Sequence, residues 1–145
     1  MNLSILRIFL AFLGAIVSVG GAFLVGLSQA LLPRPALFPL SIFVFVEWAS
    51  LGGVCFWGLA VRKEPVQFPR INAAWFAMGA LTPMAVIGVF TIGLFVFYSQ
   101  LLFLDAAILN LIQNKISLLS TIKYFGFGRV INLGILLILI RISRL

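Results

Sequence analysis

Long apolar runs dominate the pattern of hydrophobic and polar residues along this chain. Residues 71–104 include no charged side chain, and residues 8–33 and 35–61 together include a single one, Glu47. A helix rises about 1.5 Å per residue and the hydrocarbon core of a bilayer is roughly 30 Å thick, so each run is long enough to cross a membrane. The pattern predicts an all-α integral membrane protein.

The three runs define the first three expected helices. They cover residues 4–32, 38–61 and 71–104. Pro33 and Pro35 end the first helix, because proline cannot donate a backbone hydrogen bond and restricts the residue before it. A straight helix over the third run would be about 50 Å long, so we expect it either to tilt and project from the bilayer or to be kinked at Pro83.

The C-terminal part of the chain is less regular, because basic residues interrupt its apolar positions. Polar side chains recur there at three- and four-residue steps, at Asn110, Gln113, Asn114, Ser117 and Thr121. This spacing predicts an amphipathic helix over residues 106–123 that lies along an interface or against a partner. A short fourth helix is expected over 129–142. The fold is therefore predicted to be a small polytopic bundle of three to four transmembrane helices, with four favoured, in one domain of residues 1–145.

Composition agrees with this pattern and excludes a soluble domain. The chain is 63% hydrophobic and 9% charged, with a net charge of +7 and a mean hydropathy of +1.26. Soluble domains carry about 25% charged residues. The basic residues stand singly at the edges of apolar runs, which indicates anchors that reach lipid phosphates rather than a nucleic-acid surface. The interfacial anchors expected at helix ends are Arg62, Lys63, Arg70, Arg141 and Arg144.

These charges leave the orientation open. With four spans and the N-terminus inside, a slight majority of the basic residues lies inside, whereas three spans favour the opposite orientation. Two further charges fall near predicted helix ends. We expect Asp105 to mark an interface or to cap the next helix, and Arg129 to extend its side chain toward the headgroups.

The first helix contains a stripe of small residues at a strict four-residue step. Its members are Gly14, Ser18, Ala22, Gly26 and Ala30. In lipid, close packing between backbones replaces the hydrophobic drive that assembles soluble bundles, so such a stripe predicts a helix-packing face. The partner helix belongs either to this chain or to another subunit.

Glu47 is the most informative polar residue, because it lies near the middle of the second apolar run. A charged side chain at the bilayer centre costs about 3 kcal/mol on insertion scales. The carboxyl group is therefore expected to be protonated, paired or exposed to a water-filled path. It forms either an intramembrane ion or proton site or a structural hydrogen bond to a neighbouring helix.

The residues that are missing exclude most chemistries. The chain has no histidine and only three acidic residues. Histidine-ligated haem, zinc and di-iron centres and carboxylate metal sites are therefore not expected, and neither is histidine-based acid/base catalysis. The single cysteine, Cys55, cannot form an internal disulfide and is expected to pack as a small hydrophobe. We expect no enzyme activity, no catalytic residue and no cofactor. Bound lipids are expected, and a quinone or pigment between aromatic side chains remains an open alternative.

The first two expected helices distantly resemble the hairpin of rotor-ring subunits of rotary ATPases. Those subunits pair a helix rich in small residues with one that carries a mid-membrane carboxylate, here Glu47. The chain departs from that pattern in the wider spacing of its small residues, in the loop of residues 33–36 and in the helices that follow. The resemblance covers less than half of the chain, and its function is not transferred.

Two functions remain as alternatives. The favoured one is a non-catalytic accessory subunit of a larger membrane complex, with an energy-converting membrane, respiratory or photosynthetic, as one setting. The other is a small homo-oligomeric channel or transporter that uses Glu47. The expected partners are other membrane subunits and lipids, with no nucleic acid and no soluble substrate. The expected location is a bacterial cytoplasmic membrane or an organellar inner membrane.

Overall fold

The computed structural model describes residues 2–31, 40–60, 68–88 and 92–143, and the regular elements in these ranges are all helices. They are α1 (Leu3–Ala15), the π-helix η1 (Ile16–Gly20), α2 (Gly21–Ala30), α3 (Leu40–Ala60), α4 (Phe68–Ile87), α5 (Gly93–Asn114) and α6 (Leu118–Ile142). Because α1, η1 and α2 continue one another, the described residues form five rods. The prediction of an all-α fold is confirmed.

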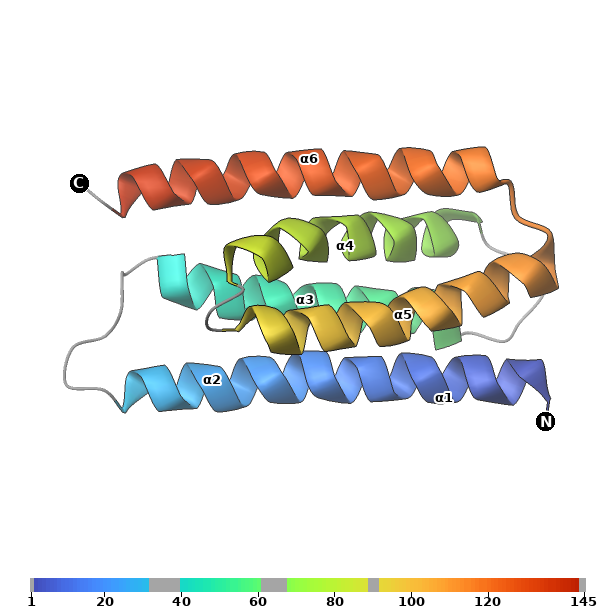
Figure 1. Ribbon diagram of the computed structural model, residues 1–145, viewed down its shortest axis with the longest axis horizontal. Helices are drawn as coiled ribbons and strands as arrows, with labels where there is room; N and C mark the ends of the chain where they lie inside the picture. Colours follow the sequence, from blue (N-terminus) through green and yellow to red (C-terminus); the bar gives the residue numbers. More distant parts are fainter. Residues whose placement is uncertain (1, 32–39, 61–67, 89–91, 144–145) are drawn as a thin grey trace.

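The rods pack side by side, and each runs antiparallel to the one before it (Figure 1). The first rod lies against α3 and α5. Helix α4 lies inside the bundle, in contact with α3, α5 and α6, whereas α6 packs mainly on α4. Because the number of described rods is odd, the two ends of the chain lie at opposite ends of the bundle (Figure 1).

Four helices are long and apolar enough to cross a membrane, which confirms the predicted membrane protein with four candidate spans. They cover Leu3–Gln29, Ile42–Ala60, Gly93–Asn114 and Leu118–Ile142. Within each of these helices, only 17–33% of the 18-residue segment used to identify the span is buried in the bundle. The exposed remainder is rich in large apolar side chains, which suits contact with lipid tails.

The third predicted helix is wrong in its extent, because the apolar run of residues 71–104 forms parts of two helices. Helix α4 contains Pro83 and continues past it to Ile87, so the proline is not the break. Helix α5 begins at Gly93, whose amide donates to the Gly88 carbonyl at 2.6 Å. A Cβ on Gly93 would lie 2.5 Å from the Ala85 carbonyl oxygen, so the close approach of the two helix ends requires glycine there.

The predicted amphipathic segment and short fourth helix are also corrected. Helix α5 extends to Asn114 and ends at Lys115, which adopts the left-handed conformation with φ 48°. The chain then starts α6 at Leu118, well before the expected start at residue 129. Residues 106–123 therefore belong to two different candidate spans, so they do not form one helix along an interface.

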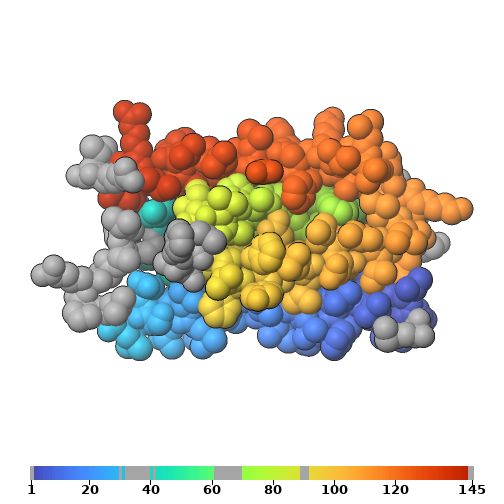
Figure 2. All heavy atoms as spheres, viewed as in Figure 1, coloured from blue at the N-terminus to red at the C-terminus, as the bar shows by residue number. Residues whose placement is uncertain are grey.

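The core pairs large rings with small residues. Trp48 of α3 and Phe103 of α5 are fully buried. A Cβ on Gly14 would lie 2.9 Å from the Phe103 ring, and one on Gly21 would lie 2.7 Å from the Trp48 ring. These glycines bring the first rod close to α3 and α5, and on the face drawn in Figure 2 the side chains of the rods fill the space between them.

Candidate functional site

The small-residue stripe of the first rod packs inside this chain. Gly14 lies against α5 and Gly26 lies against Phe45 of α3, and Ser18 and Ala22 are buried. The side chain of Ala30 lies outside the described residues. The partner of the stripe is therefore α3 and α5 of the same chain.

Ser18 also contributes a polar contact at this packing face. It lies in the π-helix η1, and its hydroxyl donates to the backbone carbonyl of Trp48 at 3.0 Å. Gly52 of α3 lies beside it, where a Cβ would meet the Ser18 side chain. Short π-helical turns often mark places where a helix adjusts to a neighbour or a functional site.

Glu47 is half-buried on α3, about 10 Å from Leu40 and about 20 Å from Ala60 at 1.5 Å per residue. Its Oε2 atom is buried and has no hydrogen-bond partner in the described part of the chain. The expected hydrogen bond to a neighbouring helix is therefore not seen among these residues. The carboxyl oxygen remains available to a proton or to a group from outside the described residues.

A second polar cluster, which the sequence did not reveal, joins α1 to α5. Arg7 is 5% exposed, and its Nη1 atom donates to Asn110 Oδ1 at 2.7 Å. The same oxygen accepts from Asn114 Nδ2, which also donates to the Asn110 backbone carbonyl at 3.1 Å. Arg7 is therefore not a lipid-facing anchor, and this part of the predicted polar stripe faces the bundle interior.

Two opposite charges are exposed in the middle of candidate spans. Asp105 lies on α5, about 18 Å from Gly93 and about 14 Å from Asn114, and Arg129 lies on α6, about 16 Å from Leu118, at 1.5 Å per residue. Neither side chain makes a hydrogen bond or an ion pair with any residue that the structure describes. The expectation that both charges mark helix ends is wrong, because the helices extend past them.

The structure describes two of the five predicted interfacial anchors, Arg70 and Arg141. The guanidinium carbon of Arg70 lies 4.9 Å from the centre of the Trp57 ring, in a cation–π arrangement near the start of α4. Arg141 is exposed in the last turn of α6. Arg62, Lys63 and Arg144 lie outside the described residues. Cys55 is buried, and its sulfur lies 3.7 Å from the Ala74 carbonyl oxygen.

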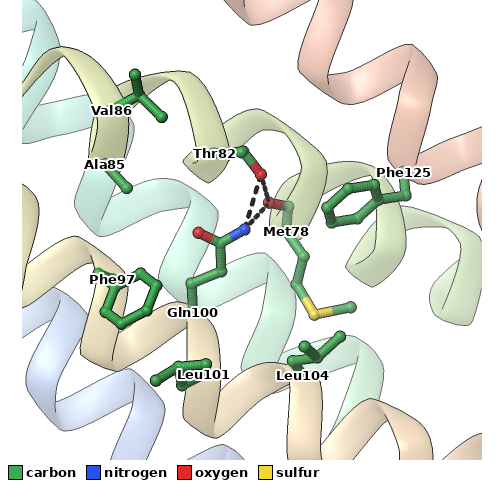
Figure 3. A pocket seen from close by; sticks show the side chains of 9 residues that line it. All are labelled: Met78, Thr82, Ala85, Val86, Phe97, Gln100, Leu101, Leu104 and Phe125. Carbon is green, nitrogen blue, oxygen red and sulfur yellow. Dashed lines mark hydrogen bonds between the residues drawn. The ribbon is translucent and has the colours of Figure 1, made fainter.

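A groove between α4, α5 and α6 has one polar corner (Figure 3). The amide nitrogen of Gln100 donates to the Met78 carbonyl at 3.2 Å and to the Thr82 hydroxyl at 2.7 Å. The Thr82 hydroxyl donates to the same carbonyl at 3.3 Å. Sequence reasoning missed this site, although Gln100 is a long polar side chain within a charge-free run.

No group of histidine, cysteine and acidic residues able to hold a metal ion occurs within the described ranges. The sequence matches no protein-family model, and neither a curated protein nor a solved structure shows a significant likeness to it. Its function is therefore argued from its own residues.

Proposed function

We propose that this protein is a non-catalytic subunit that packs, within the bilayer, against other chains of a larger membrane complex. The observation that carries this proposal is the exposure of Asp105 and Arg129 in the middle of α5 and α6. A charged side chain at that depth costs about 3 kcal/mol when it faces lipid. A neighbouring chain that offers an opposite charge or a polar group removes this cost.

The surroundings of Arg129 support a protein neighbour. Ile122 and Leu133 flank it on the same side of α6 and are 59% and 41% exposed. The guanidinium makes no hydrogen bond or ion pair with the described residues, and α6 is the least buried of the candidate spans. Helices in lipid associate through close packing and through polar groups that find partners across the interface.

Helical spans also bear on the location. Outer membranes of bacteria hold proteins with β-barrel spans, whereas the candidate spans here are helices. We propose a location in a bacterial cytoplasmic membrane or an organellar inner membrane. Fractionation of the source membranes tests this location.

The proposal is tested by removing the exposed charges and measuring which chains co-purify in a mild detergent. We expect Arg129→Leu and Asp105→Leu to reduce recovery of the partner chain at least tenfold while leaving the protein in the membrane. Arg141→Leu is the matched control, because Arg141 is exposed at the end of the same helix, and it should leave the complex intact. Equal recovery with all three variants would contradict the proposal.

An exchange of the two charges excludes a simpler explanation. If Asp105 and Arg129 paired with each other, the double variant Asp105→Arg/Arg129→Asp would restore whatever the single variants lose. We expect no restoration, because each charge meets a different group of the partner. Full restoration would assign the charges to an intramolecular pair and remove the main support for a partner.

A second candidate function rests on Glu47, whose Oε2 atom is buried without a partner in the described chain. An intramembrane carboxyl in this state suits a small homo-oligomeric channel or transporter that moves protons or cations. Purified protein in liposomes would then conduct, and Glu47→Gln would abolish the flux. A structural role for Glu47 would leave stability and assembly unchanged by this substitution, with no flux in either form.

A further inference from the structure

We propose that the groove between α4, α5 and α6 binds a membrane-dissolved molecule whose head is a hydroxyl-bearing ring and whose tail is a hydrocarbon chain. This proposal does not rest on the proposed partner contact, although Leu101 of the groove lies one helical turn from Asp105. It rests on the volume of the groove, the apolar groups that line it and one oxygen atom whose orientation is fixed.

The fixed oxygen is Oε1 of Gln100. The Gln100 amide nitrogen donates to both the Met78 carbonyl and the Thr82 hydroxyl. Rotating the amide by half a turn would set its oxygen against the Met78 carbonyl oxygen, and two acceptors repel each other. The oxygen therefore points away from both groups, as Figure 3 shows, and no residue that the structure describes donates to it.

The lining selects a ring-bearing ligand. The groove encloses about 270 Å³, and its walls are apolar apart from the corner at Gln100 and Thr82. Phe97 and Phe125 lie on either side of the Gln100 and Met78 side chains, so rings and a thioether are available to contact an aromatic head (Figure 3). A dry cavity of about 150 Å³ already holds benzene. The groove thus has room for one ring and the start of a tail.

The position of the groove suits a ligand that enters from lipid. Phe97 is 48% exposed and Leu101 is 40% exposed, so this side of the groove lies at the surface of the bundle. Gln100 lies about 10 Å along α5 from its first residue, Gly93, at 1.5 Å per residue. It is therefore inside the span and not at its end. At that depth few donors compete for the oxygen. A hydroxyl ligand gains a hydrogen bond that a phospholipid tail cannot supply.

The test uses para-decylphenol, which can donate, and its methyl ether, which cannot. Saturable binding of each radiolabelled probe to the protein in nanodiscs is compared with partition into empty nanodiscs. We expect the phenol to bind about tenfold more tightly, since one hydrogen bond contributes about 1.4 kcal/mol or less and 1.4 kcal/mol is a factor of ten in affinity. Equal affinities, or no saturable binding of the phenol, would overturn the proposal.

Variants assign the preference to the corner of the groove. Gln100→Leu should bind both probes equally, and Thr82→Val should weaken the preference because the amide loses its shorter hydrogen bond. Gln113→Leu, on the same helix, is the control and should keep the preference. Ala85→Phe should exclude both probes by filling the groove, which it lines. A preference that survives Gln100→Leu would show that the phenol binds elsewhere.

Discussion

Gly128 of α6 lies so close to Phe76 of α4 that a Cβ on the glycine would overlap the Phe76 carbonyl oxygen. The relationship is reciprocal, because a Cβ on Gly79 of α4 would overlap the carbonyl oxygen of Phe125 of α6. The two backbones are thus in direct contact where the helices cross. Close backbone approach favours helix association in lipid, so this crossing helps to hold α6 to the bundle.

We expect Gly128→Ala to destabilise the bundle by about 1–3 kcal/mol, because backbone atoms cannot move aside as a flexible side chain can. Unfolding in mixed micelles with increasing denaturing detergent measures the effect. Gly134→Ala in the same helix is the control, because a Cβ there meets nothing within 4 Å. It should be neutral or slightly stabilising, since alanine favours a helix over glycine. Equal stability of the two variants would contradict the close crossing.

The contact between the first rod and α3 makes a similar prediction with adjacent residues. A Cβ on Gly52 would overlap the Ser18 hydroxyl, which donates to the Trp48 carbonyl, whereas a Cβ on Gly53 meets nothing within 4 Å. Gly52→Ala should therefore lower the free energy of unfolding by about 1–3 kcal/mol, and Gly53→Ala should not. If Gly53→Ala proved the more harmful of the two, the assigned face of α3 would be wrong.

The Arg7 cluster predicts a loss of stability when its acceptor is removed. Asn110→Leu deletes the oxygen that accepts from Arg7 at 2.7 Å. A hydrogen bond to a charged group contributes about 1.5–3 kcal/mol, and we expect a loss of that size in the same unfolding measurement. Gln113→Leu on the same helix should change stability by less than about 0.5 kcal/mol, as for most substitutions away from buried networks.

Hydropathy predicted the class of fold, because long apolar helices are a direct consequence of bilayer thickness. The stripe of Gly14, Ser18 and Ala22 also predicted a packing face, because its four-residue step can be seen within one stretch of sequence. The turn between α4 and α5 could not be predicted from charge, because it carries none. Its signals were Gly88, Gly93 and a run too long for one upright span.

Contacts between distant residues were beyond the sequence pattern. Asn110 and Asn114 repeat with helical spacing, but nothing local shows that the partner of Asn110 is Arg7 in another helix. Gln100 and Thr82 likewise meet only after the chain has turned. The residue pattern also does not show that Asp105 and Arg129 lie inside helices, because apolar runs end or begin near each of them.

The antiparallel order of five rods predicts that the two termini lie on opposite faces of the membrane, provided that α4 crosses with the others. Among described basic residues, Arg70, Lys115 and Lys123 lie near the end of the bundle that holds the N-terminus, and Arg141 lies near the other. The positive-inside rule then predicts that the N-terminus lies on the inner side of the membrane. Reporters fused to each terminus should show opposite locations, and a shared location would contradict five crossings.

Native mass spectrometry of the assembly extracted in a mild detergent is the most direct test of the proposed function. It reports which chains accompany this protein and in what ratio. We predict at least one unlike membrane chain in a fixed ratio, lost in Arg129→Leu and retained in Arg141→Leu. A monomer without partners, or a ring of identical chains that conducts ions in liposomes, would contradict the account.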